Sequence, residues 1–243
     1  EQGSVGGTTT TPAYFLEKNS MPMKRLVILI SGRGSNLEAI LDQCTSNHWP
    51  IEVVRVISNR PDAQGLAAAQ SRGVPTGIVD HTGFLTREAF DQALLNEILG
   101  CRADLIVLAG FMRVLSSGFC RAFEGRLLNI HPSLLPAFKG LKTHEQAISA
   151  GVKVHGCTVH AVTTDLDHGP ILAQAIVPVL SGDTAATLAA RVLLMEHQIY
   201  PMAIAAVLSG RCRLIDGRWV DSGVGHFKHE YVPCLVDKNL PSH

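Results

Sequence analysis

Short apolar, β-branched runs alternate with longer amphipathic stretches between Lys24 and Val220. The runs predict strands, and five of them lie in the first half of the chain: Arg25–Ile30, Ile51–Ser58, Pro75–Val79, Asp104–Ala109 and Arg126–Ile130. Stretches with apolar residues at helical spacing lie between them: Asn36–Cys44, Ala63–Ser71, Thr86–Leu99 and Ser116–Phe123. Strands that are apolar throughout are typical of a parallel sheet covered on both faces. We therefore predict an α/β fold, a mostly parallel open sheet with helices on both faces, whose first half is Rossmann-like.

The second half of the chain follows a different pattern. After an irregular connection, a short helix is predicted near Thr143–Ala150. Two β-rich runs, His155–Thr163 and Ile171–Val179, flank a tight polar turn, which predicts an added β-hairpin. A long C-terminal helix is predicted over Thr184–Leu208, with a kink at Pro201 because proline cannot donate a helical hydrogen bond.

The ends of the chain show no clear period. Two short runs, Cys212–Ile215 and Arg218–Val220, predict a final hairpin. We therefore expect one domain over residues 23–221, a disordered extension over residues 1–22 and a flexible C-terminal tail over residues 222–243.

Composition indicates a globular chain and disfavours some classes of binding partner. Hydrophobic residues make up 46% of the 243 residues and charged residues 17%, a balance that disfavours disorder. The 21 basic residues equal the 21 acidic ones, which disfavours nucleic-acid and membrane-surface partners. No apolar run reaches the roughly 18 residues that a membrane helix needs. Six scattered cysteines without a C-x-x-C pair indicate reduced thiols, so we expect a cytoplasmic protein.

The first predicted strand leads into a glycine-rich turn over Ser31–Leu37. Converging backbone N–H groups and a helix N-terminus suit a phosphate, although a turn needed only for packing would look the same. A dinucleotide fingerprint fits poorly, because Leu37 replaces its third small residue and Ser58–Asn59–Arg60 replaces the expected acid. A mononucleotide or a sugar phosphate fits better.

The strongest candidate for chemistry is the stretch Leu127–Pro136 (L-L-N-I-H-P-S-L-L-P). Asn129 and His131 are two residues apart on a strand, so their side chains share one side at its carboxyl end. An amide beside an imidazole can stabilise an oxyanion and move a proton. A capping asparagine and a hydrogen-bonded core histidine remain the alternative.

These stretches resemble the phosphoribosylglycinamide formyltransferase family of purine synthesis. The resemblance rests on six motifs in order: Ile30–Leu37, Leu108–Leu115, Leu128–Pro136, His155–His160 (H-G-C-T-V-H), Asp165–Gly169 (D-L-D-H-G) and Glu196–Pro201 (E-H-Q-I-Y-P). It implies direct transfer of a formyl group from 10-formyltetrahydrofolate, the co-substrate, to the amine of glycinamide ribonucleotide, without a metal. The enzyme would act as a monomer or homodimer, with no nucleic acid and no membrane.

The resemblance also implies the site residues. By analogy, Asn129, His131 and Asp167 are catalytic, and His160 supports them. The ribonucleotide is expected on Gly34, Ser35, Asn36 and Glu196. The folate is expected on Arg87, Met112, Arg113, Val114, Leu115, Asn129, Thr163, Thr164, Asp165, Leu166 and Asp167.

Several of these residues have simpler interpretations. His160 also fits a buried histidine bonded to backbone, Arg113 a solvated loop residue, and Asp167 a residue that only shapes its turn. The histidine-rich stretch between His131 and His168 shows no metal-ligand spacing. Members of the family place a lysine three residues before the glutamate that matches Glu196, where this chain has a leucine.

Rival functions remain at this point. Formyltetrahydrofolate deformylase is related, but the phosphate-type turn favours the transferase and the chain has no room for that enzyme's N-terminal regulatory domain. Methionyl-tRNA formyltransferase would need an RNA-binding domain and a basic surface. A noncatalytic folate- or nucleotide-binding module would bind both ligands without transfer.

Overall fold

The structure is a computed structural model that describes residues 22–225 and 233–236. Its main sheet has eight strands in the order β10-β7-β6-β5-β4-β1-β2-β3. Five strands from the first half pair in parallel: β1 (Lys24–Ile30), β2 (Ile51–Ser58), β3 (Thr76–Ile78), β4 (Leu105–Leu108) and β5 (Leu127–His131). β6 (Val154–Ala161) then runs antiparallel to β5 and to β7 (Ile171–Pro178). The predicted parallel sheet with an added hairpin is confirmed.

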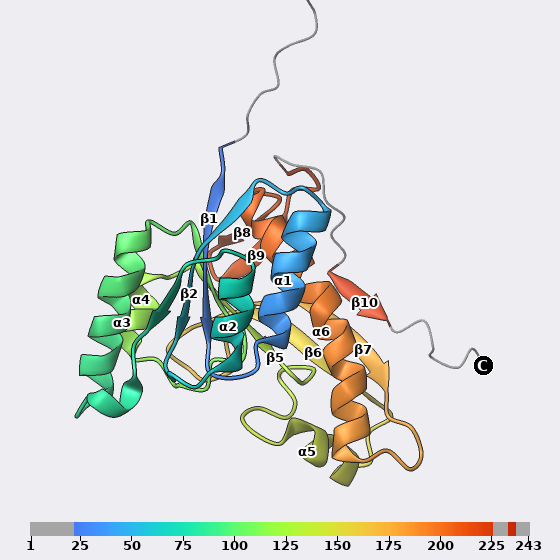
Figure 1. Ribbon diagram of the computed structural model, residues 1–243. Helices are drawn as coiled ribbons and strands as arrows, with labels where there is room; N and C mark the ends of the chain where they lie inside the picture. The colour runs from blue at the N-terminus through green and yellow to red at the C-terminus, as the bar shows by residue number, and fades with distance from the viewer. Residues whose placement is uncertain (1–21, 226–232, 237–243) are drawn as a thin grey trace, which may run out of the picture.

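Helices cover both faces of this sheet (Figure 1). One face carries α1 (Ser35–Ser46), α2 (Gln64–Ser71) and α6 (Ala185–Leu208); the other carries α3 (Arg87–Cys101) and α4 (Ser117–Ala122). The alternation of β1 explains the two layers. Leu26, Ile28 and Ile30 join the core under α1, α2 and α6, while Val27 and Leu29 join the core under α3 and α4. A strand buried on both faces therefore has a sequence that is apolar at every position.

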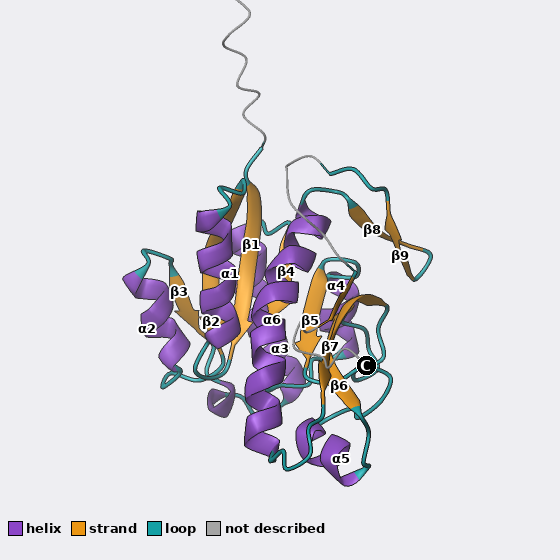
Figure 2. Ribbon diagram, turned by 90° about the vertical axis from the view of Figure 1, so that its right-hand side faces the viewer, coloured by secondary structure: helices purple, strands orange, loops and turns teal. Residues whose placement is uncertain are grey.

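The remaining elements lie at the ends of the sheet. A 3₁₀ turn, η1 (His81–Gly83), follows β3, and α5 (Thr143–Ser149) packs against α6. The predicted final hairpin is present as β8 (Cys212–Ile215) and β9 (Arg218–Asp221), which lies apart from the main sheet (Figure 2).

The long helix α6 begins as the sequence suggests. The Thr184 hydroxyl accepts a hydrogen bond from the N–H of Thr187, so Thr184 is the N-cap of the helix. The α-helix continues through Pro201, where a kink was expected. Tyr200, beside that proline, is fully buried, and its hydroxyl points its one proton between the carbonyl oxygens of Leu108 in β4, at 2.9 Å, and Leu128 in β5, at 3.2 Å.

The C-terminal segment contains an element that the sequence pattern did not predict. β10 (Cys234–Val236) pairs in parallel with β7. Three residues are too few to give a periodic signal. Residues 1–21, part of the expected extension, lie outside the described residues.

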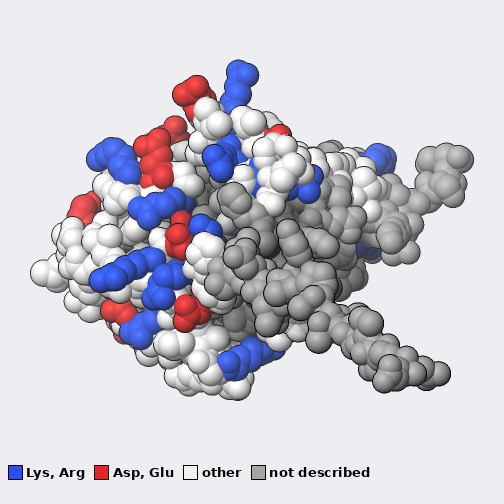
Figure 3. Space-filling model, turned by 90° about the horizontal axis from the view of Figure 1, so that it is seen from above, with Lys and Arg blue, Asp and Glu red and all other residues white. Residues whose placement is uncertain are grey.

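Two further observations concern the surface. Basic and acidic side chains lie among one another on the face seen in Figure 3. Within residues 22–225 and 233–236, no helix combines the length and apolar character needed to cross a membrane.

Candidate active site

A cavity of about 700 Å³ opens at the carboxyl ends of β4 and β5, beside the turn that follows β1. The strand order reverses between β1 and β4, and ligands bind at such a switch point in open α/β sheets. Fourteen of the predicted site residues line the cavity: Asn36, Met112, Arg113, Val114, Leu115, Asn129, His131, His160, Thr163, Thr164, Asp165, Leu166, Asp167 and Glu196. Gly34, Ser35 and Arg87 are not among the lining residues.

His131 lies on the wall of this cavity, at the last position of β5. Its side chain is 6% exposed. Nε2 is 3.0 Å from the carbonyl oxygen of Phe138, which can only accept a hydrogen bond, so Nε2 carries a proton. Nδ1 is 3.5 Å from Oδ2 of Asp167. The proton that this imidazole gains or gives up is therefore the one at Nδ1.

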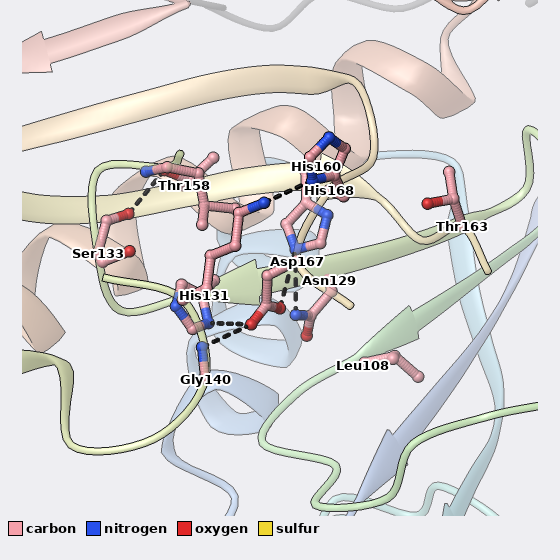
Figure 4. Close-up of polar contacts among 12 residues, drawn as sticks. Leu108, Asn129, His131, Ser133, Gly140, Thr158, His160, Thr163, Asp167 and His168 are labelled. Atoms are coloured by element: carbon pink, nitrogen blue, oxygen red, sulfur yellow. Dashed lines mark hydrogen bonds and ion pairs between the residues drawn. The ribbon is translucent and has the colours of Figure 1, made fainter. Parts of the chain in front are cut away.

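Asp167 reaches His131 from the turn between β6 and β7 (Figure 4). Its backbone has a φ of 49°, a left-handed conformation that few residues other than glycine, asparagine and aspartate adopt readily. The N–H of Gly140 donates to Oδ2 at 3.0 Å. Aspartate therefore suits this position both by its backbone conformation and by the carboxylate that it offers to His131.

His160 holds the amide of Asn129 in place. The two residues face each other across the β5–β6 ladder. Burial lowers the pKa of His160, which keeps the ring neutral. Its Nδ1 then donates to the carbonyl of Ala161 at 2.9 Å, and its Nε2 accepts from Nδ2 of Asn129 at 3.2 Å. One hydrogen of the Asn129 amide remains available to a ligand.

The glycine-rich turn ends at the N-terminus of α1. Gly34 precedes that helix with a φ of 82°, and no side chain caps the helix. A Cβ at Gly34 would lie 2.9 Å from the Cα of Gly65 in α2, while the Gly65 N–H donates to the carbonyl of Gly32 at 3.0 Å. Glycine is therefore needed at position 34 for both conformation and space, and the uncapped N–H groups suit an anion.

Asn36 and Glu196 form a buried pair at the same end of the cavity. Nδ2 of Asn36 donates to Oε2 of Glu196 at 2.7 Å, and both residues are buried. Burial raises the pKa of Glu196, and the hydrogen bond from Asn36 opposes that shift. A carboxylate fixed in this way can accept hydrogen bonds from vicinal hydroxyls. Leu193, one turn earlier on α6, is not among the residues that line the cavity.

The opposite side of the cavity is more apolar and more open. Met112, Val114 and Leu166 are all more than half exposed, which suits the edges of a flat ring system. The Arg113 guanidinium lies 5.7 Å from the centre of the Phe90 ring, and its Nε is buried without a hydrogen-bond partner. Arg87 begins α3 and lies 3.6 Å from Glu88.

Sequence reasoning missed the loop over residues 138–142. It supplies the carbonyl of Phe138 and the N–H of Gly140, and Lys139 Nζ contacts Nδ1 of His168 at 2.5 Å. Phe138 and Lys142 both have positive φ. Because backbone atoms make two of these contacts, no residue type in the loop signals them. Among the described residues, no group of three His, Cys, Asp or Glu side chains is arranged to hold a metal.

Known proteins with this sequence pattern point to one activity. A family model described as formyl transferase matches residues 24–204. The chain is 47% identical over 197 residues to a phosphoribosylglycinamide formyltransferase of Escherichia coli, covering 81% of this chain and 93% of that protein. It is 48% identical to a trifunctional purine biosynthetic protein of Bos taurus, over 78% of this chain and 19% of that protein. A crystal structure of glycinamide ribonucleotide transformylase 1 from Symbiobacterium toebii superimposes with a TM-score of 0.79, at 48% identity, over 82% of this chain and 94% of that one.

Proposed function

The chain belongs to the phosphoribosylglycinamide formyltransferase family, and we propose that Asn129, His131 and Asp167 carry out its reaction. The enzyme transfers a formyl group from 10-formyltetrahydrofolate to the amine of glycinamide ribonucleotide in purine biosynthesis. The observation that carries the proposal is the meeting of these three side chains on one cavity wall, from β5 and from the turn after β6.

We place the two substrates at opposite ends of the cavity. The phosphate of the ribonucleotide lies on the N–H groups of Gly34, Ser35 and Asn36, and Glu196 accepts its ribose hydroxyls. The folate lies along residues 112–115 and the turn over residues 163–167, whose exposed apolar side chains cover its ring system. Arg87 and Arg113 supply positive charge for the carboxylates of the folate. The formyl carbon then falls between the two ends, beside Asn129 and His131.

The first chemical step is attack of the neutral amine on the formyl carbon. An amine of the α-amino type has a pKa of about 8, so a usable fraction is neutral at pH 7. Attack creates a tetrahedral intermediate with a negative oxygen. The free Nδ2 hydrogen of Asn129 and the proton on Nδ1 of His131 stabilise that oxygen, and each such donor contributes roughly 3 kcal/mol in comparable sites.

The second step is collapse of the intermediate. The bond from the carbon to N10 of the folate breaks, the attacking amine loses a proton and N10 gains one. His131 gives its Nδ1 proton to N10 and then takes up the proton of the amine at the same nitrogen, and the Asp167 carboxylate stabilises the imidazolium before and after this exchange. The Phe138 carbonyl holds the ring still, because its hydrogen bond fixes Nε2. No covalent enzyme intermediate is needed.

The test is a spectrophotometric assay of folate product with and without glycinamide ribonucleotide. We expect tetrahydrofolate to form only when the ribonucleotide is present, in a ratio of one to one with formylated ribonucleotide. Folate product without the ribonucleotide would indicate a deformylase, in which water replaces the amine. Binding of both ligands with no product would indicate a noncatalytic module.

A further inference from the structure

One side chain of the glycine-rich turn is engaged by neighbours outside that turn. Ser31 follows β1 directly and is 5% exposed. Its hydroxyl accepts a hydrogen bond from the N–H of Met112 at 2.8 Å and lies 2.5 Å from Oδ1 of Asn59. Met112 follows β4, and Asn59 follows β2. The hydroxyl therefore ties three strand ends together.

The direction of these hydrogen bonds is fixed by Asn59, which is 2% exposed. Its Oδ1 can only accept, so the Ser31 hydroxyl must donate its one proton there. The lone pairs of the hydroxyl are then left for the N–H of Met112. His81 holds the backbone of the same residue, since its Nδ1 lies 2.8 Å from the carbonyl oxygen of Asn59, which can only accept a hydrogen bond.

Met112 needs such an anchor because the sheet no longer holds the chain there. The N–H of Ala109 still donates to the carbonyl of Leu29 in β1 at 2.9 Å. Three residues later, the side chain of Met112 is 65% exposed. The backbone bond to Ser31 thus fixes the start of the stretch over residues 112–115 that lines the cavity.

We propose that Ser31 is a positioning residue for the folate side of the cavity. It belongs by sequence to the turn that we assign to the ribonucleotide phosphate, yet its hydroxyl acts on the opposite wall. The turn therefore serves both substrates, with Ser31 for the folate at one end and Gly34 to Asn36 for the phosphate at the other. This inference rests on the proposed function, which places the folate along residues 112–115.

The test is steady-state kinetics of Ser31→Ala with each substrate varied in turn. The variant leaves the Met112 N–H and Oδ1 of Asn59 without their partner. We expect the KM for 10-formyltetrahydrofolate to rise about five- to fiftyfold, the range for one unpaired buried donor. The KM for glycinamide ribonucleotide should stay within about twofold, because the phosphate contacts are untouched.

Two further variants separate the hydrogen bond from the shape of the side chain. Ser31→Thr keeps the hydroxyl and should restore most of the folate KM. Ser31→Cys keeps the size but offers a weak acceptor, so it should resemble Ser31→Ala. At the other end of the turn, Gly34→Ala should show the reverse split, with a higher KM for the ribonucleotide and an unchanged KM for the folate.

Amide hydrogen exchange at Met112 gives a readout that does not depend on turnover. Exchange should speed up in Ser31→Ala and return toward the wild-type rate in Ser31→Thr. Equal rises in both KM values, a rise for the ribonucleotide alone, or unchanged exchange would overturn the inference. The proposed function fails separately, since it is refuted if the wild-type enzyme transfers no formyl group to the ribonucleotide.

Discussion

The two halves of the sheet offer different kinds of atoms to a ligand. At the ends of the parallel strands β1 and β2, the turn over residues 31–36 presents backbone N–H groups at a helix N-terminus, shaped by two facing glycines. At β5 and β6, where the sheet turns antiparallel, side chains face the ligand instead. Their polar atoms lie 3.2 Å apart from Asn129 to His160, 3.9 Å from His160 to Asp167 and 3.5 Å from Asp167 to His131.

Because the two halves offer different atoms, we expect the parallel half to control substrate affinity and the antiparallel half to control the chemical step. Backbone donors do not titrate, so the N–H groups of this turn add no pH dependence of their own to ligand binding on the parallel side. Within the described residues, the three buried histidines, His131, His155 and His160, all lie on β5 and β6. Changes on the antiparallel side should therefore alter turnover and pH response, and changes on the parallel side should alter substrate affinity.

The largest effect is expected at His131. His131→Ala removes the group that carries the proton, so turnover should fall by about 10²- to 10⁴-fold while both KM values change little. Steady-state kinetics measures this split. His48→Ala, at an exposed histidine of the parallel half, is the control and should leave turnover unchanged. Near-normal turnover of a folded His131→Ala enzyme would show that the antiparallel half of the sheet does not supply the catalytic group.

Asp167→Asn tests whether charge matters beside that imidazole. Asparagine also tolerates a φ of 49° and keeps an oxygen for the Gly140 N–H, so the turn should survive. Loss of the carboxylate should lower turnover about 10- to 100-fold, the range for a hydrogen bond to a charged group. Circular dichroism checks the fold, and kinetics checks the rate. An unchanged rate would show that Asp167 serves only to shape the turn.

Stability should depend on pH through His155, whose ring packs between those of Phe138 and His144. Burial lowers the pKa of His155 from 6.5 to about 4, so the unfolded chain binds an additional proton between these values. Stability should then fall as the pH drops from about 6.5 to 4, by on the order of 3 kcal/mol in total.

Denaturant titrations across that range measure the slope. His155→Leu has no group to titrate and a similar volume, so its stability should vary less with pH than that of the wild type. Parallel curves for the two proteins would mean that His155 is not the source of the acid sensitivity.

On the parallel side, Gly34→Ala should impair binding rather than chemistry. A left-handed φ costs a non-glycine residue about 1–2 kcal/mol, and the new methyl group would also meet the Cα of Gly65. We expect a rise of about 5- to 30-fold in the KM for the ribonucleotide, with a smaller change in kcat. Gly32→Ala is the matched control, because its Cβ would meet nothing within 4 Å. Equal effects of the two variants would contradict the geometric argument.

The smallest effect is expected at Leu193. Leu193→Lys should add a cation near the ribonucleotide phosphate, partly screened, and contribute about 0.5–1 kcal/mol. The KM for the ribonucleotide should fall about two- to fivefold with kcat unchanged, and the gain should shrink as salt rises from about 0.05 M to 0.5 M. An unchanged KM at low salt would show that position 193 does not reach the phosphate.

Local pattern was enough to predict much of this molecule. Continuous apolar runs identified the parallel strands, because a strand buried on both faces has no polar side. The two-residue spacing of Asn129 and His131 placed them together at the end of β5. The Phe138 carbonyl, the Gly140 N–H and the bond from Ser31 to Met112 could not be predicted, because each joins segments brought together only by tertiary structure. β10 could not be predicted for a similar reason, since its three residues form a strand only by pairing with β7.

The close approach of Gly34 and Gly65 limits which substitutions this enzyme can tolerate at either position. A Cβ at Gly65 would lie 2.6 Å from Cδ1 of Ile30 and 3.2 Å from the Cα of Gly34. A side chain at position 65 would displace the start of α1 and lower the affinity for substrate, although Gly65 does not line the cavity. In a deep mutational scan under selection for purine prototrophy, position 65 should tolerate as little as position 34. A map of fitness would then mark as functional a residue that lies outside the cavity and acts on substrate binding by its lack of a side chain.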